Sequence, residues 1–156
     1  MHHNKTMPVV RGRMDASGKK VAVIVSRWNE LVTKELLAGA LEVLEAHGID
    51  DPLVVHVPGT WEIPVSASSL VETHDAVVAL GCILQGQTPH AKLLGGDVGG
   101  ALMSLQVSAG KPISWGILTP DTQDQALDRA GLKYGNKGRE AALAVIEMMS
   151  VLDQLN

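Results

Sequence analysis

Four short, nearly continuous apolar segments divide this sequence, and each is followed by a stretch whose apolar residues recur at helical spacing. The apolar segments lie at residues 21–25, 53–57, 76–84 and 113–118. Such runs are typical of strands buried on both faces, as in a parallel sheet covered by helices. Helices are expected at 31–47, 63–72, 122–130 and 137–152, with a further one from about 90 to 110. Alternating strands and helices predict right-handed crossovers and a three-layer α/β/α sandwich.

Residues with special backbone preferences mark several helix boundaries. Gly48 and Gly110 stand where two of the expected helices should end. Pro64 fits a helix only in its first turn, which is where the pattern places it. Asp121 is the N-cap that we expect for the helix that follows the fourth strand.

The chain is long enough for one domain with its own core. It contains no internal repeat, linker or low-complexity segment, so we expect a single domain over 1–156 with an N-terminal arm at 1–18. The element order predicts a flavodoxin-like fold with a four-stranded parallel sheet. Such folds bind ligands at the carboxyl ends of the strands, where the strand order reverses. The loops that should carry a site are therefore 26–30, 58–62, 85–90 and 118–121.

Composition excludes several classes of protein. The formal net charge is -4 and the pI is about 5.8, whereas nucleic-acid binding needs a basic surface. No apolar run reaches the roughly 20 residues that span a bilayer, and the polar, basic segment 1–13 is unlike a secretory signal. The single cysteine, Cys82, cannot form an internal disulfide, which fits a reducing compartment. We therefore expect a cytoplasmic protein with no nucleic-acid or membrane partner.

The loop at 85–90 has the composition of a small-molecule site. Gly86 allows the backbone to approach a ligand, and free N–H groups at the start of the following helix favour an anion. Thr88 could donate a hydroxyl hydrogen bond to that anion or could be only the N-cap of the helix, and this segment alone leaves both open. It is not a P-loop, because the glycine spacing and the Gly-Lys-Ser/Thr ending are missing.

His90 falls in the first turn of the same helix, beside the expected anion site. An imidazole with a pKa near neutrality can move protons to and from nitrogen or a carbonyl oxygen. The alternative is a surface histidine, which is how we interpret His47, His56 and His74. No His, Cys, Asp or Glu cluster has metal-ligand spacing, and no Ser or Cys lies in a nucleophile elbow.

Aromatic stacking surfaces have few sources, since the chain has three Trp, one Tyr and no Phe. Trp28 follows the first strand, Trp61 follows the second, and Trp115 is expected near the end of the fourth. Each could stack on a planar heterocycle or could pack in the core. Glu62 could accept hydrogen bonds from ligand hydroxyls or could serve as a favourable charge at a helix N-terminus.

Two basic residues after the fourth strand are candidates for the same site. Arg129 lies near a helix end, and Lys137 lies in Gly135-Asn136-Lys137-Gly138. Either could complement a helix dipole. Arg129 could instead hold a phosphate with its planar fork of donors, and the sequence alone does not decide.

Several separated motifs occur in a fixed order along the chain. They are Arg27-Trp28-Asn29-Glu30, the stretch 57–64, Gly86-Gln87-Thr88-Pro89-His90, Gly116-Ile117-Leu118-Thr119, and 125–131 leading into 135–138. The ordered set resembles the lumazine synthase family of riboflavin biosynthesis, and the resemblance covers about residues 19–152. It implies condensation of 5-amino-6-(D-ribitylamino)uracil with 3,4-dihydroxy-2-butanone 4-phosphate to give 6,7-dimethyl-8-ribityllumazine, phosphate and water.

The resemblance implies a place for each matching residue around the uracil substrate. Trp28 would stack on its pyrimidine ring. The stretch that would hold the ribityl chain is Thr60, Trp61 and Glu62. The strand end whose backbone would read the uracil edge is Cys82, Ile83 and Leu84.

The second substrate is assigned in the same way. The phosphate site would be formed by Gly86, Gln87 and Thr88, and His90 would transfer protons. A neighbouring subunit would supply Trp115, Arg129 and Lys137, with Arg129 on the phosphate. Because the chemistry needs proton transfer, charge neutralisation and orientation of two substrates, the resemblance implies neither a metal nor an organic cofactor.

Some residues depart from the family's common pattern. Trp stands at three positions where Phe is common, and Gln85, Pro89 and Ala91-Lys92 differ around the histidine. These departures motivate an alternative, a shell-forming or flavin-binding paralogue with weak catalysis. A flavodoxin-like electron carrier is a further alternative, but it would leave His90 and Arg129 without a role.

Assembly is implied by the resemblance as well. The segment 131–138 is short and uninterrupted, as in members of the family whose pentamers build 60-subunit icosahedral shells. We therefore expect a pentamer-based homo-oligomer, with the 60-mer favoured over a pentamer or decamer. Riboflavin synthase is a candidate partner.

Overall fold

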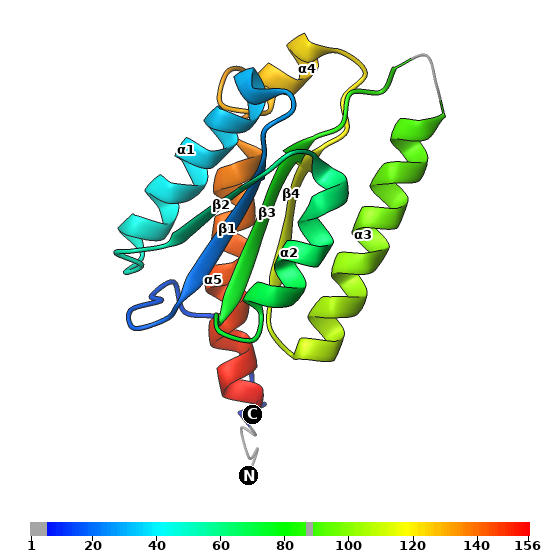
Figure 1. Cartoon of the computed structure of the whole chain (residues 1–156). Coiled ribbons are helices and arrows are strands. Elements are labelled where there is room, and N and C mark those ends of the chain that lie inside the picture. The colour runs from blue at the N-terminus through cyan, green and yellow to red at the C-terminus, as the bar shows by residue number, and fades with distance from the viewer. Residues whose placement is uncertain (1–5, 87–88) are drawn as a thin grey trace.

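The computed structural model describes residues 6–86 and 89–156. Its four strands are β1 (Val21–Ser26), β2 (Leu53–Val57), β3 (Ala76–Cys82) and β4 (Ile113–Leu118). They form one sheet in the order β2-β1-β3-β4, and every pairing is parallel (Figure 1). This is the strand order of flavodoxin-like sheets, so the predicted fold is confirmed.

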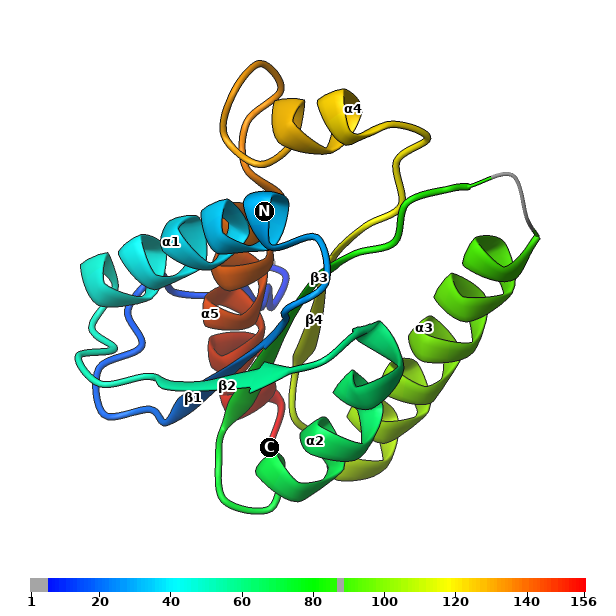
Figure 2. The same ribbon diagram turned by 45° about the horizontal axis from the view of Figure 1, so that its top comes forward.

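Helices cover both faces of the sheet (Figure 2). One face carries α1 (Glu30–Ala46) and α5 (Lys137–Leu155), with the short α4 (Gln123–Asp128) beside α1. The other carries the 3₁₀ turn η1 (Thr60–Glu62), α2 (Ile63–Leu70) and α3 (His90–Ala109). Among these helices none is both long enough and apolar enough to cross a membrane, as far as the described residues go.

Two hydrophobic cores explain why the strands are apolar at successive positions. The side chains of Val21, Val23 and Val25 join the cluster under α1 and α5. Ile24, between them, joins the cluster under α2 and α3. Because successive strand residues face opposite sides, both sides of β1 are buried.

Three of the expected helix signals are confirmed. Gly48 and Gly110 follow α1 and α3 with φ angles of 100° and 66°, a conformation that glycine adopts without strain. Pro64 lies in the first turn of α2.

Two boundaries near the strand ends differ from the prediction. β3 ends at Cys82 and not at residue 84, because its register with β4 ends there, opposite Leu118. The N-cap of α4 is Thr122 and not Asp121, since Thr122 Oγ1 accepts a hydrogen bond from Gln125 N at 3.2 Å. Both residues are good caps, and Asp121 instead donates its backbone N–H to Gln125 Oε1 at 3.0 Å.

The N-terminal arm lies along the last helix. Arg13 N donates to Ser150 Oγ at 2.8 Å, and Gln154 Nε2 donates to Arg11 O at 2.7 Å. These contacts support the end of α5, which reaches Leu155 where the sequence predicted an end near 152. α2 and α4 in turn stop slightly earlier than predicted, at Leu70 and Asp128.

Candidate active site

The sheet divides between β1 and β3 at the carboxyl ends of the strands. β1 is in register with β3 only as far as Val25. Beyond it β1 stays with β2, since Arg27 N donates to Val57 O at 2.8 Å. β3 stays with β4, since Ile83 N donates to Leu118 O at 2.8 Å. This split coincides with the reversal of strand order, where such folds bind ligands.

Trp28 lies at this split, directly after β1. Its side chain is 63% exposed, so packing in the core is not its role. The ring packs against Gly59, where any side chain would collide with it. Trp28 N also donates to Pro58 O at 3.0 Å, which ties the loops after β1 and β2 together. The indole is therefore held in place and still available for stacking.

The loop after β2 places the next three candidates differently from one another. Thr60 is buried, with its methyl group against Gly81. Trp61 is 65% exposed, so it is not a core residue either. The Glu62 carboxylate accepts a hydrogen bond from Gly59 N at 3.1 Å, and it thereby stabilises the turn. Trp61 and Glu62 also line a groove of about 470 Å³ between α2 and α3.

The segment after β3 leaves backbone groups free at the split. Ile83 and Gln85 donate their N–H groups to the β4 side, to Leu118 O and Pro120 O. In an extended chain, alternate residues direct their backbone groups to opposite sides, so Leu84 N–H and C=O face the split. Leu84 has no backbone hydrogen bond to any residue that the structure describes. The split therefore offers one donor and one acceptor to a flat ligand.

The thiol of Cys82 is buried. Burial raises the pKa of the Cys82 thiol to about 11, so the thiol is neutral and unreactive at pH 7. Throughout 6–86 and 89–156, no three His, Cys, Asp or Glu side chains gather into a possible metal site.

We expect iodoacetamide to leave Cys82 unmodified in the native protein at pH 8 and to alkylate it rapidly in urea. The thiol has a pKa of 9.0 in its unperturbed state and about 11 when folded. From about pH 9 upward the unfolded chain loses the proton first, so this thiol's contribution to stability is lost as the pH rises towards 11. Mass spectrometry of the alkylated protein checks the prediction, and fast labelling of the native chain would contradict it.

The loop before α3 is described in part. Gln87 and Thr88 lie outside the described residues, so their expected phosphate contacts stay predictions. Gly86 is exposed, with open space where a side chain would stand. α3 begins at His90 with Pro89 in the N-cap position. His90 thus lies in the first helical turn, as the sequence predicted, and its side chain is exposed.

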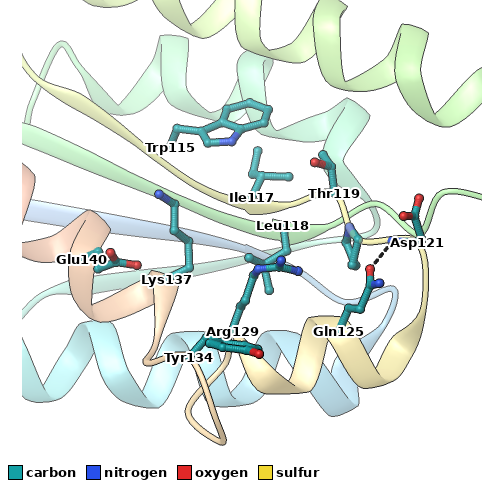
Figure 3. Close-up of a pocket in the computed structure, with 11 residues that line it drawn as sticks. Trp115, Ile117, Leu118, Thr119, Asp121, Gln125, Arg129, Tyr134, Lys137 and Glu140 are labelled. Atoms are coloured by element: carbon teal, nitrogen blue, oxygen red, sulfur yellow. Dashed lines mark hydrogen bonds between the residues drawn. The ribbon is translucent and has the colours of Figure 1, made fainter.

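Trp115, Arg129 and Lys137 line a separate cavity of about 590 Å³ at the β4 edge of the sheet (Figure 3). Figure 3 shows the Lys137 side chain extending from the start of α5 towards Trp115. No ion pair of Arg129 or Lys137 occurs within the part of the chain that the structure describes. Both cations are therefore available to an anion.

The alternative that each of these cations only complements a helix dipole has a different outcome for Lys137 and for Arg129. Lys137 is the first residue of α5, and a positive charge is unfavourable at a helix N-terminus. That alternative is therefore wrong for Lys137. Arg129 follows the last residue of α4 as its C-cap, so it can complement that dipole and still face the cavity.

The sequence suggested that Trp115 lies near the end of β4, and this prediction is wrong. It is the third residue of the strand, opposite Ala79. Its half-buried ring lies against Gly99 of α3. The strand runs on to Leu118, since its apolar pattern continues past the tryptophan.

Sequence reasoning missed several residues around these two places. Asp121, Gln125 and Tyr134 line the cavity with Arg129. The first two follow the carboxyl end of β4, a position that could have indicated them, whereas Tyr134 stood out only as the one tyrosine among four aromatic residues able to stack on a ligand. Asn29 was missed as well: its Nδ2 donates to Cys82 O at 2.8 Å across the split.

The residues expected to form one site thus fall into two groups. Trp28, the backbone of Leu84 and the loop after β2 lie around the split and the adjoining α2–α3 groove. The two cations line the cavity at the β4 edge, and no residue of 26–30 or 58–62 lines that cavity.

Comparison with known proteins identifies the family of this chain. Residues 18–153 match the family described as 6,7-dimethyl-8-ribityllumazine synthase. A protein of that name from Salinibacter ruber is 46% identical over 94% of this chain and 96% of its own length. Those from Aquifex aeolicus and Kosmotoga olearia are 40% and 42% identical, over 96% of this chain and 99% and 98% of theirs. The chain belongs to the 6,7-dimethyl-8-ribityllumazine synthase family.

Proposed function

We propose that this protein condenses 5-amino-6-(D-ribitylamino)uracil with 3,4-dihydroxy-2-butanone 4-phosphate to give 6,7-dimethyl-8-ribityllumazine, phosphate and water. The family match over residues 18–153 carries the proposal. The reaction joins an amine to a ketone, expels phosphate and closes a second ring. These steps need orientation and proton transfer, and the proposal involves no metal or organic cofactor.

The split between β1 and β3 is the proposed site of the uracil substrate. The exposed ring of Trp28 would stack on the pyrimidine. The N–H and C=O of Leu84 would pair with the edge of the ring, while Cys82 and Ile83 shape the strand end. The ribityl chain would extend along Thr60, Trp61 and Glu62, of which the last two line the neighbouring groove.

The phosphorylated substrate is assigned to the loop before α3 together with the cavity at the β4 edge. Gly86, Gln87 and Thr88 would cradle the phosphate, and His90 would transfer protons beside it. Arg129 and Lys137 line a cavity that shares no residue with the Trp28 side. We therefore assign these two cations and Trp115 to the site of an adjacent subunit.

A site divided in this way requires an oligomer. We propose a pentamer-based assembly of a single 156-residue domain with its arm at 1–18, and we favour the 60-subunit shell. The uninterrupted loop before α5 supports it, since this loop is compact: Gly131 N donates to Gly135 O and Tyr134 N to Asp128 O, both at 2.7 Å. A cytoplasmic location and riboflavin synthase as partner are part of the same proposal. Light scattering should give a particle near 1 MDa for sixty chains of 16.5 kDa, against far smaller masses for a pentamer or decamer.

The activity is tested by incubating the purified protein with both substrates. Lumazine absorbance should rise faster than in the uncatalysed mixture, and the rate should scale with protein concentration. An assembled particle that gives no acceleration would favour the paralogue with weak catalysis.

His90→Ala is expected to lower kcat by about 10- to 100-fold, at or below the lower limit of what a general acid–base residue usually contributes. The effect should be modest because orientation of the two substrates supplies much of the acceleration. The particle mass should not change, since the side chain is exposed in the first turn of α3. His56→Ala, at an exposed position on β2, is the matched control. An unaltered kcat in the His90 variant would show that the histidine is misassigned.

A further inference from the structure

One side-chain hydrogen bond crosses the split in the sheet. Asn29 Nδ2 donates to Cys82 O at 2.8 Å, between residues 53 positions apart. The backbone register of β1 with β3 has already ended at Val25 and Leu80. The amide of Asn29 therefore takes the place of a ladder bond at the last carbonyl of β3.

The backbone of Asn29 is fixed by the first turn of α1. Its φ and ψ are 65° and 44°, and it is the one non-glycine residue with positive φ among those that the structure describes. Asparagine tolerates this left-handed region better than most residues. Its carbonyl accepts hydrogen bonds from Val32 N at 2.9 Å and Thr33 N at 3.0 Å. The side chain thus projects from a position that α1 holds rigidly.

Asn29 stands between the two surfaces that a flat ligand would contact. Trp28, its neighbour, belongs to the β2 side through its hydrogen bond to Pro58 O and its contact with Gly59. Leu84 belongs to the β4 side and lies two residues after Cys82. The distance between the Trp28 ring and the Leu84 backbone therefore depends on the contacts that join the β2 side of the split to its β4 side.

We propose that the Asn29 side chain sets this spacing and acts as a positioning residue for the ring of the uracil substrate. The inference rests on the proposed function, and it assigns Asn29 no proton transfer. Without the amide, the part-buried Cys82 carbonyl would lose its partner, which is unfavourable unless water enters. A gap that widens even slightly would loosen both the stacking on Trp28 and the pairing with Leu84.

Two substitutions separate the side chain from the backbone conformation. Asn29→Asp keeps the size and the tolerance for positive φ, but a carboxylate cannot donate to Cys82 O. Asn29→Gly keeps positive φ without strain and removes the side chain. Glu30→Gln, at the exposed neighbouring position, is the control and should behave like the unaltered protein.

Both Asn29 variants should raise the KM for ribitylaminouracil about tenfold and leave the KM for the butanone phosphate within twofold. Quenching of tryptophan emission by ribitylaminouracil should show the same tenfold weakening at equilibrium. A merely structural role would lower the thermal unfolding midpoint and change both KM values alike. The midpoint is therefore measured in parallel.

Several outcomes would overturn the inference. If the Asn29→Gly variant binds the uracil substrate as tightly as the unaltered protein, Asn29 is needed only because it tolerates a positive φ, and its side chain positions nothing. If both KM values rise equally, the effect is not specific to the ring. A protein that binds ribitylaminouracil without turnover would contradict the proposed function alone, and the quenching titration would still decide the role of Asn29. Failure of the unaltered protein to bind ribitylaminouracil would overturn both.

Discussion

Replacing Arg129 by alanine is expected to raise the KM for 3,4-dihydroxy-2-butanone 4-phosphate by about 100-fold, with the KM for the uracil substrate nearly unchanged. A guanidinium can bind a phosphate with two parallel, charge-assisted hydrogen bonds. Losing one partner of a hydrogen-bonded charge pair that is buried in the complex costs about 2–5 kcal/mol, and a 100-fold change corresponds to about 2.7 kcal/mol. Arg129 is exposed, lines the cavity and has no ion-pair partner among the described residues, so its charge is available.

Two matched variants sharpen this prediction, and steady-state kinetics with each substrate varied in turn supplies the measurement. Arg129→Lys keeps the charge but loses the fork, so it should fall between the alanine variant and the unaltered protein. Lys133→Ala removes a nearby cation that lies 5.4 Å from the Tyr134 ring centroid and does not line the cavity. It should leave both KM values unchanged. If Lys133→Ala matched Arg129→Ala, general electrostatic attraction would explain the effect better than a phosphate contact.

The sheet could be predicted because strands buried on both faces appear in the sequence as short, continuous apolar runs. Val21, Val23 and Val25 join one hydrophobic core and Ile24 joins the other, and a short, continuous apolar run is typical of strands in a sheet covered on both faces. The end of β3 could not be predicted in the same way. Residues 83 and 84 are as apolar as those before them, and the strand ends where its register with β4 ends, opposite Leu118, which is a property of the neighbouring strand.

The loops of the site could be predicted, but the behaviour of the side chains in them could not. Trp28 is exposed because Gly59 leaves room for its ring against the next loop. That contact joins residues 31 positions apart and has no local signal. The roles of Asp121 and Thr122 depend on a similar detail, since both are good helix caps and the difference between them is one residue of register.

The division of the site into two groups has a different cause. Arg129 and Trp28 are both sequence candidates, yet the strand order places β1 inside the sheet and β4 at its edge. A sequence shows which loops follow strands, whereas the separation of those loops follows from topology. The edge position of β4 is also why its cavity can be completed by a second chain, because no strand among the described residues covers it.

Replacing Gly138 by alanine is expected to destabilise the fold by about 3 kcal/mol, the upper end of the usual cost of overpacking. Gly138 is the second residue of α5, and a Cβ there would collide with the backbone carbonyl of Leu36 in α1. A backbone group cannot rotate aside as a flexible side chain can, so the two helices would have to separate. A Cβ on Gly39 of α1 would likewise collide with the side chain of Asn136, the N-cap of α5, which leaves little room for adjustment.

Guanidinium unfolding followed by circular dichroism measures the Gly138 effect, with Gly100→Ala as the control. Gly100 is exposed on α3 with open space around it, so alanine there should be neutral or slightly stabilising because it favours the helix. Gly138→Ala should unfold at a clearly lower denaturant concentration. Because Lys137 precedes Gly138 at the start of α5 and lines the cavity, the same variant should also lose activity at temperatures where it remains folded. An unchanged unfolding midpoint would mean that α1 and α5 can move apart without cost, and that the position of Lys137 is set by something other than their contact.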